Sequence, residues 1–269
     1  MIVVGGGIAG LTAAALLARD GVKVSLLEAH HQTGGCAGTF RRRGWVFDVG
    51  ATQVAGLEPG GSHARLLKHL NVPLPAAEIL NPGCVVDLGD GSPPIPLWHD
   101  PEAWAAEREH QFPGSKPFWS LCHQLHSSNW QFANQDPVVT PRSLWDLGTM
   151  LRALRPATLA SGLFTGLTIA DLLQLCGCGQ DQRLRRFLDL QLKLYSQEPA
   201  NRTAALYGAT VLQMAQAPLG LWHLEGSMQV LSDQLVAAIK RDGGNVLLKH
   251  RVTKLQPCSS GWQVHVTTA

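Results

Sequence analysis

Residues 2–28 of the chain read IVVGGGIAGLTAAALLARDGVKVSLLE. The short β-branched run at residues 2–4 is typical of a buried parallel strand. A glycine-rich turn follows at residues 5–10, and the Ala- and Leu-rich residues 11–19 predict a helix. Residues 22–27 then predict a second strand. This stretch therefore predicts the strand–helix–strand unit that begins a doubly wound α/β, Rossmann-like fold.

The glycines of this turn have the spacing Gly-x-Gly-x-x-Gly, which predicts a dinucleotide site. Gly5 permits the tight turn, Gly7 lets the backbone approach a pyrophosphate, and Gly10 allows close packing of helix and strand. The helix N-terminus offers free N–H groups and a positive dipole end to the phosphates. Glu28 ends the second strand, where its carboxylate can accept hydrogen bonds from ribose hydroxyls. The alternative is a glycine turn in an ordinary α/β domain, which leaves the position of this acid unexplained.

Composition excludes several other classes of protein. The chain has 269 residues, of which 45% are hydrophobic and only 16% charged, so it is neither disordered nor a charged coiled coil. Lys and Arg number 22 against 20 Asp and Glu, a balance that gives no indication of a nucleic-acid partner. No uncharged apolar run reaches the ~20 residues of a membrane span. The six cysteines have no metal-ligand spacing, so we expect no metal site and a reducing, cytoplasmic setting.

The order of the motifs resembles a known family. After the glycine motif and Glu28, the chain continues with Gly34-Gly35 and with Phe47-Asp48-Val49-Gly50. This order is similar to that of the FAD-dependent carotenoid desaturases and isomerases, the phytoene desaturase-like flavoproteins. Three longer stretches are similar to the C-3′,4′ carotenoid desaturases of cyanobacteria. These stretches are residues 47–61, 187–197 and 226–232.

The resemblance implies FAD as the cofactor and assigns residues to it. The glycine motif and Glu28 match the pyrophosphate and ribose contacts, the second glycine pair runs beside the cofactor, and Gly50-Ala51 passes near the flavin ring. The backbone at Val252 matches a segment facing the adenine. Many relatives carry Arg directly after the glycine pair, where this chain has Cys36, so Arg42 or Arg43 is the alternative for that contact. The candidate cofactor-binding residues are Gly5, Gly7, Gly10, Glu28, Gly34, Gly35, Arg42, Gly50, Ala51 and Val252.

The resemblance also implies a domain organisation. Residues 1–56 form the first part of an FAD-binding domain, 57–220 an inserted substrate-binding region, and 221–269 the returning segment of the FAD-binding domain. Within the last segment, residues 228–241 have helical periodicity, and residues 245–250 and 262–267 predict strands. Relatives are about twice as long, so we expect this chain to be an N-terminal portion of a longer protein.

The implied activity is desaturation of a carotenoid, in which the flavin takes a hydride and a neighbouring carbon loses a proton. A quinone or oxygen would reoxidise the flavin. Because the substrate is insoluble in water, we expect peripheral contact with a membrane surface, on its cytoplasmic side. A carotenoid cis–trans isomerase using reduced FAD is the first alternative. A prenyl-binding escort protein without flavin is the second, although the intact glycines and Glu28 disfavour it.

The inserted region contains few residues whose spacing indicates a catalytic or metal-binding role. Six of the chain's eight tryptophans lie at residues 98–222 and could form aromatic walls for a polyene, although ordinary core roles are the alternative for each. The pair His123-x-x-His126 lacks the acid of a metalloprotease motif, and we interpret its members as solvated or capping histidines. We interpret Cys176-Gly177-Cys178 as a packed loop. No side chain can be assigned a catalytic role from the sequence.

Overall fold

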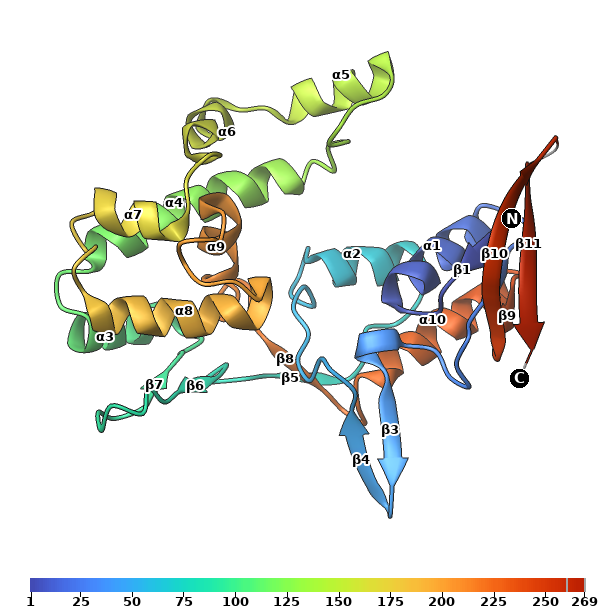
Figure 1. Cartoon of the computed structure of the whole chain (residues 1–269), viewed down its shortest axis with the longest axis horizontal. Helices are drawn as coiled ribbons and strands as arrows, with labels where there is room; N and C mark the ends of the chain where they lie inside the picture. Colours follow the sequence, from blue (N-terminus) through green and yellow to red (C-terminus); the bar gives the residue numbers. More distant parts are fainter. Residues whose placement is uncertain (260, 269) are drawn as a thin grey trace. The chain divides into compact units, whose positions relative to one another are not determined.

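The computed structural model describes residues 1–259 and 261–268, which divide into two compact units (Figure 1). Unit 1 combines residues 1–80 with the segment that returns at residue 221, and unit 2 comprises residues 81–220. The family resemblance predicts an insertion that begins at residue 57. In the structure, residues 57–80 belong to unit 1, because Leu67 and Leu70 are buried in the core of that unit.

Unit 1 contains a parallel sheet with helices and antiparallel strand pairs around it. Its elements are β1 (Ile2–Val4), α1 (Ile8–Arg19), β2 (Ser25–Leu27), the 3₁₀ turn η1 (Gly35–Ala37), β3 (Thr39–Arg42), β4 (Trp45–Asp48), α2 (Ser62–His69), β5 (Ala77–Ile79), β8 (Trp222–Leu224), α10 (Gln229–Arg241), β9 (Asn245–Leu247), β10 (His250–Cys258) and β11 (Gly261–Thr268). The predicted strands and helices of this unit are confirmed to within a few residues at their ends.

The parallel sheet has the strand order β1-β2-β9, with Val3 opposite Leu26 and Leu26 opposite Val246. The predicted burial of the first strand is wrong for Ile2 and Val4, which are 47% and 52% exposed. Successive side chains of a strand point to opposite faces, so Ile2 and Val4 share the face opposite to Val3, which packs against the core of unit 1.

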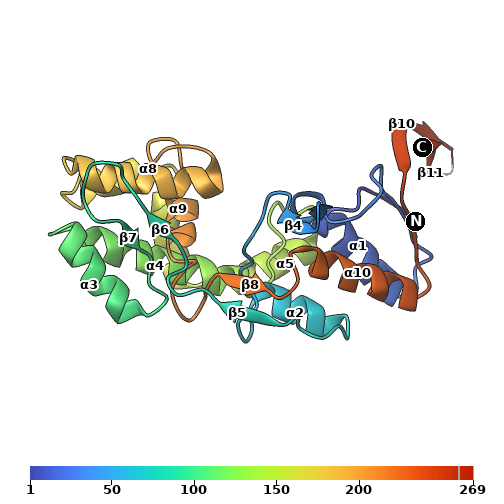
Figure 2. The same ribbon diagram turned by 90° about the horizontal axis from the view of Figure 1, so that it is seen from below.

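The core of unit 1 lies between α1 and α10, which run side by side in both views (Figures 1 and 2). Helix α1 buries Leu11, Ala14 and Ala15, spaced on one face, and its many alanines let a neighbouring backbone come close. Helix α10 buries Leu235 and Ile239 against this face. The helix returning from residue 229 is therefore part of the same core as the N-terminal strand–helix–strand unit.

Unit 2 is mainly helical. Its elements are β6 (Val85–Val86), β7 (Ile95–Pro96), α3 (Pro101–Gln111), α4 (Lys116–Ala133), α5 (Leu144–Ala153), α6 (Pro156–Ser161), the 3₁₀ turn η2 (Gly162–Phe164), α7 (Ile169–Leu175), α8 (Gln182–Ser196) and α9 (Ala205–Val211). Helix α4 packs against α6 and α9, and α8 also contacts α9. An aromatic cluster holds α3, α4 and α8 together, since Phe187 contacts Trp104, Phe112 and Trp119.

The described helices include none that is both long enough and apolar enough to cross a lipid bilayer.

Candidate dinucleotide site

The glycine turn of residues 5–10 joins β1 to α1 at the carboxyl end of the parallel sheet. The amide of Gly5 donates to the carbonyl of Leu27, which ties the turn to the neighbouring strand at 2.8 Å. A β-carbon on Gly10 would lie 2.0 Å from the carbonyl oxygen of Gly5, so helix and turn can meet here only through a glycine. A β-carbon on Gly7 would meet no protein atom within 4 Å.

The first turn of α1 keeps its amides available to an anion. Gly7 is the N-cap residue and has extended backbone, and no side chain caps the helix. The first N–H groups of a helix lack partners within the helix, and the dipole adds positive potential there. Gly7 thus faces open space beside uncapped amides, which is the geometry required for a pyrophosphate.

Glu28 connects the second strand to the glycine turn. Its Oε2 accepts a hydrogen bond of 2.5 Å from the amide of Gly6, and its Oε1 accepts one of 2.7 Å from the amide of His30. A carboxylate has about four lone-pair sites, so these two bonds leave capacity for the hydroxyl groups of a ribose. A β-carbon on Gly6 would lie 3.0 Å from Oε2 of Glu28. Gly6 occupies a variable position of the glycine motif, and here it allows the carboxylate to approach.

The second glycine pair lies directly against the first. The amide of Gly34 donates to the carbonyl of Gly6 at 2.8 Å, and a β-carbon on Gly35 would lie 3.3 Å from the Cα of Gly7. Both residues have positive φ, 118° at Gly34 and 58° at Gly35, which favours glycine there. The structure therefore brings these two predicted motifs together.

Two further predicted segments join this cluster. The amide of Ala51 donates to the carbonyl of Cys36 at 3.0 Å, which places Gly50-Ala51 beside the second glycine turn. The amide of His250 donates to the carbonyl of Glu28 at 2.8 Å, so the strand that contains Val252 starts next to the predicted ribose contact. Val252 itself is half-buried in β10.

Arg42 lies apart from this cluster of backbone contacts. It pairs with Trp45 at the tip of the hairpin formed by β3 and β4, whereas the base of that hairpin is the pair Thr39 and Asp48. Arg42 and Trp45 are both exposed. The role of Arg42 in cofactor binding thus stays a prediction that the hairpin geometry does not support.

A partly buried network of hydrogen bonds next to the second glycine turn has no counterpart among the sequence predictions. Thr39 Oγ1 donates to Asp48 Oδ1 at 2.9 Å and accepts from the amide of Gln229 at 3.2 Å. The side-chain amide of Gln229 donates to the carbonyl of Thr33 at 3.2 Å. This network fixes the start of α10 to the glycine turn. The resemblance over residues 226–232 is the available signal, because it marks this segment without giving it a role.

The candidates in the inserted region do not form a reactive centre. Trp104 and Trp119 are buried in the aromatic cluster, whereas Trp145 is 70% exposed. His126 is buried and its ring lies 5.5 Å from that of Trp130. Among the described residues, no group of three or more His, Cys, Asp or Glu side chains could hold a metal ion.

Comparisons with known proteins agree with this geometry. Residues 3–70 match the family model described as NAD(P)-binding Rossmann-like domain. The chain is 24% identical over 264 residues to all-trans-retinol 13,14-reductase of Danio rerio, covering 94% of this chain and 42% of that protein. It is 44% identical over 61 residues to a chloroplastic prolycopene isomerase of an Oncidium hybrid cultivar, covering 23% of this chain and 10% of that protein. Among solved structures, an oxidoreductase from Methanosarcina mazei aligns with a TM-score of 0.61 and 19% identity, covering 99% of this chain and 56% of that one.

The chain spans less than half the length of the retinol reductase that it matches. The predicted fold class is confirmed, and the residues that form the nucleotide site fit the predicted cofactor, FAD. Residues 3–70 of this chain are thus similar to a NAD(P)-binding Rossmann-like domain, and the chain shares its fold with a solved oxidoreductase.

Proposed function

We propose that the protein containing this chain is an FAD-dependent oxidoreductase that acts on a carotenoid- or retinoid-like polyene. The observation that carries the proposal is the convergence of Gly6, Glu28 and Gly34 at the uncapped start of α1, linked by hydrogen bonds of 2.5 Å and 2.8 Å. This convergence supports a dinucleotide site with an acid for the ribose. The names of the relatives, a retinol reductase and a prolycopene isomerase, support a conjugated polyene as the substrate.

In the proposed site each part of the chain has a physical task. The amides at the start of α1 bind the pyrophosphate, and Glu28 accepts hydrogen bonds from the ribose. The backbone at Gly34 and Gly35 runs beside the cofactor, and Gly50-Ala51 lies near the flavin ring. Bound FAD supplies hydride transfer to or from a carbon atom of the substrate. Neither Gly50 nor Ala51 has an acidic or basic side chain, which suits the transfer of a hydride from an apolar molecule.

Within this class we propose desaturation, specifically at the C-3′,4′ bond of a carotenoid. The support is the resemblance of residues 47–61, 187–197 and 226–232 to carotenoid desaturases. The substrate would lose a hydride and a proton from neighbouring carbons, and a quinone or oxygen would accept the electrons from the flavin. We further propose that the protein reaches its water-insoluble substrate by peripheral contact with the cytoplasmic side of a membrane.

Isomerisation of a carotenoid is the second candidate. The specific observation in its favour is the 44% identity over 61 residues to a prolycopene isomerase. Both reactions require the same nucleotide site, so the geometry of the glycines and Glu28 does not separate them. They differ in the mass of the product, because isomerisation leaves the number of hydrogens unchanged.

The test expresses the complete reading frame containing this chain in a host that accumulates an acyclic or monocyclic carotenoid. Pigments are then analysed by chromatography and mass spectrometry. Loss of two hydrogens with a red-shifted spectrum supports desaturation, and unchanged mass with altered retention supports isomerisation. The variant Glu28→Ala serves as the control for the flavin site. An unchanged pigment, together with purified protein that takes up no FAD, would contradict the proposal and favour the escort protein.

A further inference from the structure

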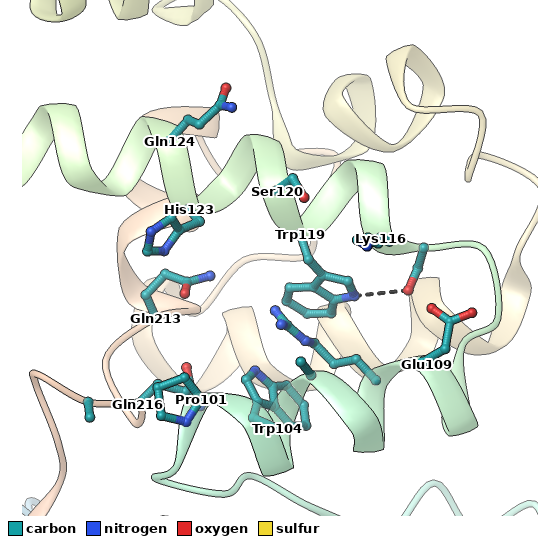
Figure 3. A pocket seen from close by; sticks show the side chains of 14 residues that line it. Pro101, Trp104, Glu109, Lys116, Trp119, Ser120, His123, Gln124, Gln213 and Gln216 are labelled. Carbon is teal, nitrogen blue, oxygen red and sulfur yellow. Dashed lines mark hydrogen bonds between the residues drawn. The ribbon is translucent and has the colours of Figure 1, made fainter.

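A cavity of about 800 Å³ lies within unit 2, between α3, α4 and the segment after α9 (Figure 3). Its volume is in the range of sites for small organic molecules. Figure 3 shows Trp104 and Trp119 reaching into this space from two helices, with Gln213 and Gln216 near it from a third segment. Pro101, Ala105 and the two indole rings give the cavity apolar walls. All of these residues lie outside the dinucleotide site.

One cation in this cavity has no counter-ion. The guanidinium carbon of Arg108 lies 5.4 Å from the ring centroid of Trp104 and 5.0 Å from that of Trp119. In the described part of the chain, the guanidinium makes neither an ion pair nor a hydrogen bond. Burial lowers the pKa of Arg108 to about 10, so the group still carries its charge at neutral pH. A guanidinium held against aromatic rings keeps its N–H edge free for a planar, two-oxygen acceptor.

Two buried amides in the same wall also lack partners. Gln213 and Gln216 are 8% and 5% exposed. Nε2 of Gln213 and both amide atoms of Gln216 make no hydrogen bond within the described residues. Leaving buried polar atoms unsatisfied costs free energy, so native structures rarely do it without a reason. A ligand oxygen in this cavity would accept hydrogen bonds from Nε2 of Gln213 and Nε2 of Gln216 after a small shift of these side chains, whereas Oε1 of Gln216 is itself an acceptor.

A second cavity adjoins the first along α4. It has a volume of about 470 Å³ and shares His123 and Gln124 with the first cavity as wall residues. Its other walls include the apolar side chains Leu121, Leu125 and Phe164. The two cavities are therefore neighbours along α4, and the second adds apolar surface beside the first.

We propose that unit 2 binds an amphipathic carboxylate of the fatty-acid type in these two cavities. The carboxylate would pair with the free edge of Arg108 and lie near the amides of Gln213 and Gln216. The hydrocarbon chain would follow the indole rings toward the second cavity. A carboxylate fits better than a phosphate, because the wall carries the cations Arg108 and Lys116 against the carboxylate of Glu109, a net charge of +1 that one carboxylate balances. This proposal does not rest on the proposed function, since it involves neither the flavin nor the polyene.

The test is isothermal titration calorimetry of the 269-residue chain, without flavin, with dodecanoate as the probe. We expect saturable binding with one site, and binding of methyl dodecanoate that is at least tenfold weaker because the ester carries no charge. We expect affinity to rise from octanoate to dodecanoate by up to about fourfold for each methylene group buried. Acetate should compete only at far higher concentration.

Variants test the assignment of the head group. Arg108→Gln should weaken dodecanoate binding at least tenfold, and Arg108→Lys should weaken it less. Lys193→Gln is the matched control, because this lysine of α8 is exposed and lines neither cavity, and it should change affinity less than threefold. Circular dichroism checks that each variant is folded.

Several results would overturn the proposal. They are equal affinity for acid and ester, competition by acetate as strong as by dodecanoate, an Arg108→Gln variant that folds and binds like the wild type, or no saturable binding at all. The comparison of acid and ester uses the wild-type chain, so it decides the question even if the variants do not fold.

Discussion

The amide of Gly6 donates a hydrogen bond of 2.5 Å to the Glu28 carboxylate, across 22 residues of sequence. This bond joins the start of the glycine turn to the end of the neighbouring strand. It therefore makes the predicted ribose acceptor part of the loop that is predicted to hold the phosphates. Removing the carboxylate should affect the shape of the loop as well as ligand binding.

Glu28→Ala should accordingly lower both stability and FAD affinity. Two backbone amides would lose a charged acceptor, and we expect a loss of about 1–3 kcal/mol in the free energy of unfolding. Urea unfolding without ligand and titration with FAD measure the two effects separately. Glu28→Gln keeps one oxygen acceptor and should lie between the wild type and Glu28→Ala in both measurements. Wild-type FAD affinity in Glu28→Ala would remove this residue from the site.

Gly7→Ala and Gly10→Ala form a matched pair that separates ligand contact from folding. The new methyl at residue 10 would lie 2.0 Å from the Gly5 carbonyl oxygen, so we expect a loss of about 1–3 kcal/mol in unfolding free energy. The methyl at residue 7 meets no protein atom within 4 Å, so this variant should unfold like the wild type. Its FAD affinity should nevertheless fall at least tenfold, because the methyl occupies the space predicted for the pyrophosphate. Thermal unfolding and flavin absorbance titration measure these outcomes, and undiminished FAD binding by Gly7→Ala would contradict the predicted phosphate site.

Alkylation of Cys36 should report on the second glycine turn. Cys36 follows Gly34-Gly35 and is exposed, as is Cys258 in β10. We expect FAD to slow the reaction of iodoacetamide with Cys36, while Cys258 continues to react at its original rate. Peptide mass spectrometry after timed quenching distinguishes the two thiols. Equal rates at Cys36 with and without saturating FAD would show that the cofactor does not cover this turn.

Cys122 provides a test of burial in unit 2. Its side chain is fully buried in α4, and this burial raises the pKa of the Cys122 thiol far above its usual range. Because the thiolate is the reactive form, Cys122 should stay unmodified in the native protein and react only after unfolding. Reaction at the rate of Cys36 in native buffer would contradict the packing of α4.

His126 should make the stability of the protein depend on pH. Burial, with a smaller contribution from the charge of His123, lowers the pKa of His126 to about 4. In the unfolded chain the pKa is about 6.5, so between these values the unfolded state binds a proton that the folded state does not. The contribution of neutral His126 to the free energy of unfolding is therefore fully present above about pH 6.5. It is lost as the pH decreases toward 4, and the loss amounts to up to about 3 kcal/mol.

The variant His126→Gln isolates this effect. It removes the titrating group from α4, so the difference in unfolding free energy between pH 7.5 and pH 5 should become smaller than in the wild type. Urea denaturation of both proteins at the two pH values measures this difference. An identical pH dependence in both would assign the effect to other groups.

The part of the site that could be predicted from sequence is the part encoded locally. Gly5, Gly10 and Glu28 belong to one strand–helix–strand unit, in which the element lengths fix their mutual position. The bond from Gly34 to Gly6 depends on tertiary packing, and only the resemblance to a family indicates that these glycines meet.

The remainder depends on contacts that no local pattern specifies. Thr39 and Gln229 are 190 residues apart, and their hydrogen bonds exist only because α10 returns to the core of unit 1. The charge of Arg42 favours a cofactor contact, but the hairpin register places this residue at the tip. Arg108 and Gln216 line one cavity although they lie on segments about a hundred residues apart, so neither stands out in the sequence.

The amide of Leu80 donates to the carbonyl of Leu221 at 2.9 Å, immediately before the chain leaves unit 1 and after it returns. The two ends of the 140-residue helical segment are therefore held together by the paired strands β5 and β8. An insertion with adjacent ends can change in length or be replaced at small entropic cost to its host. Exchange of this helical segment would therefore leave the glycine turns of unit 1 unaltered. A protein engineer could use the same junction to graft a different helical segment between residues 80 and 221.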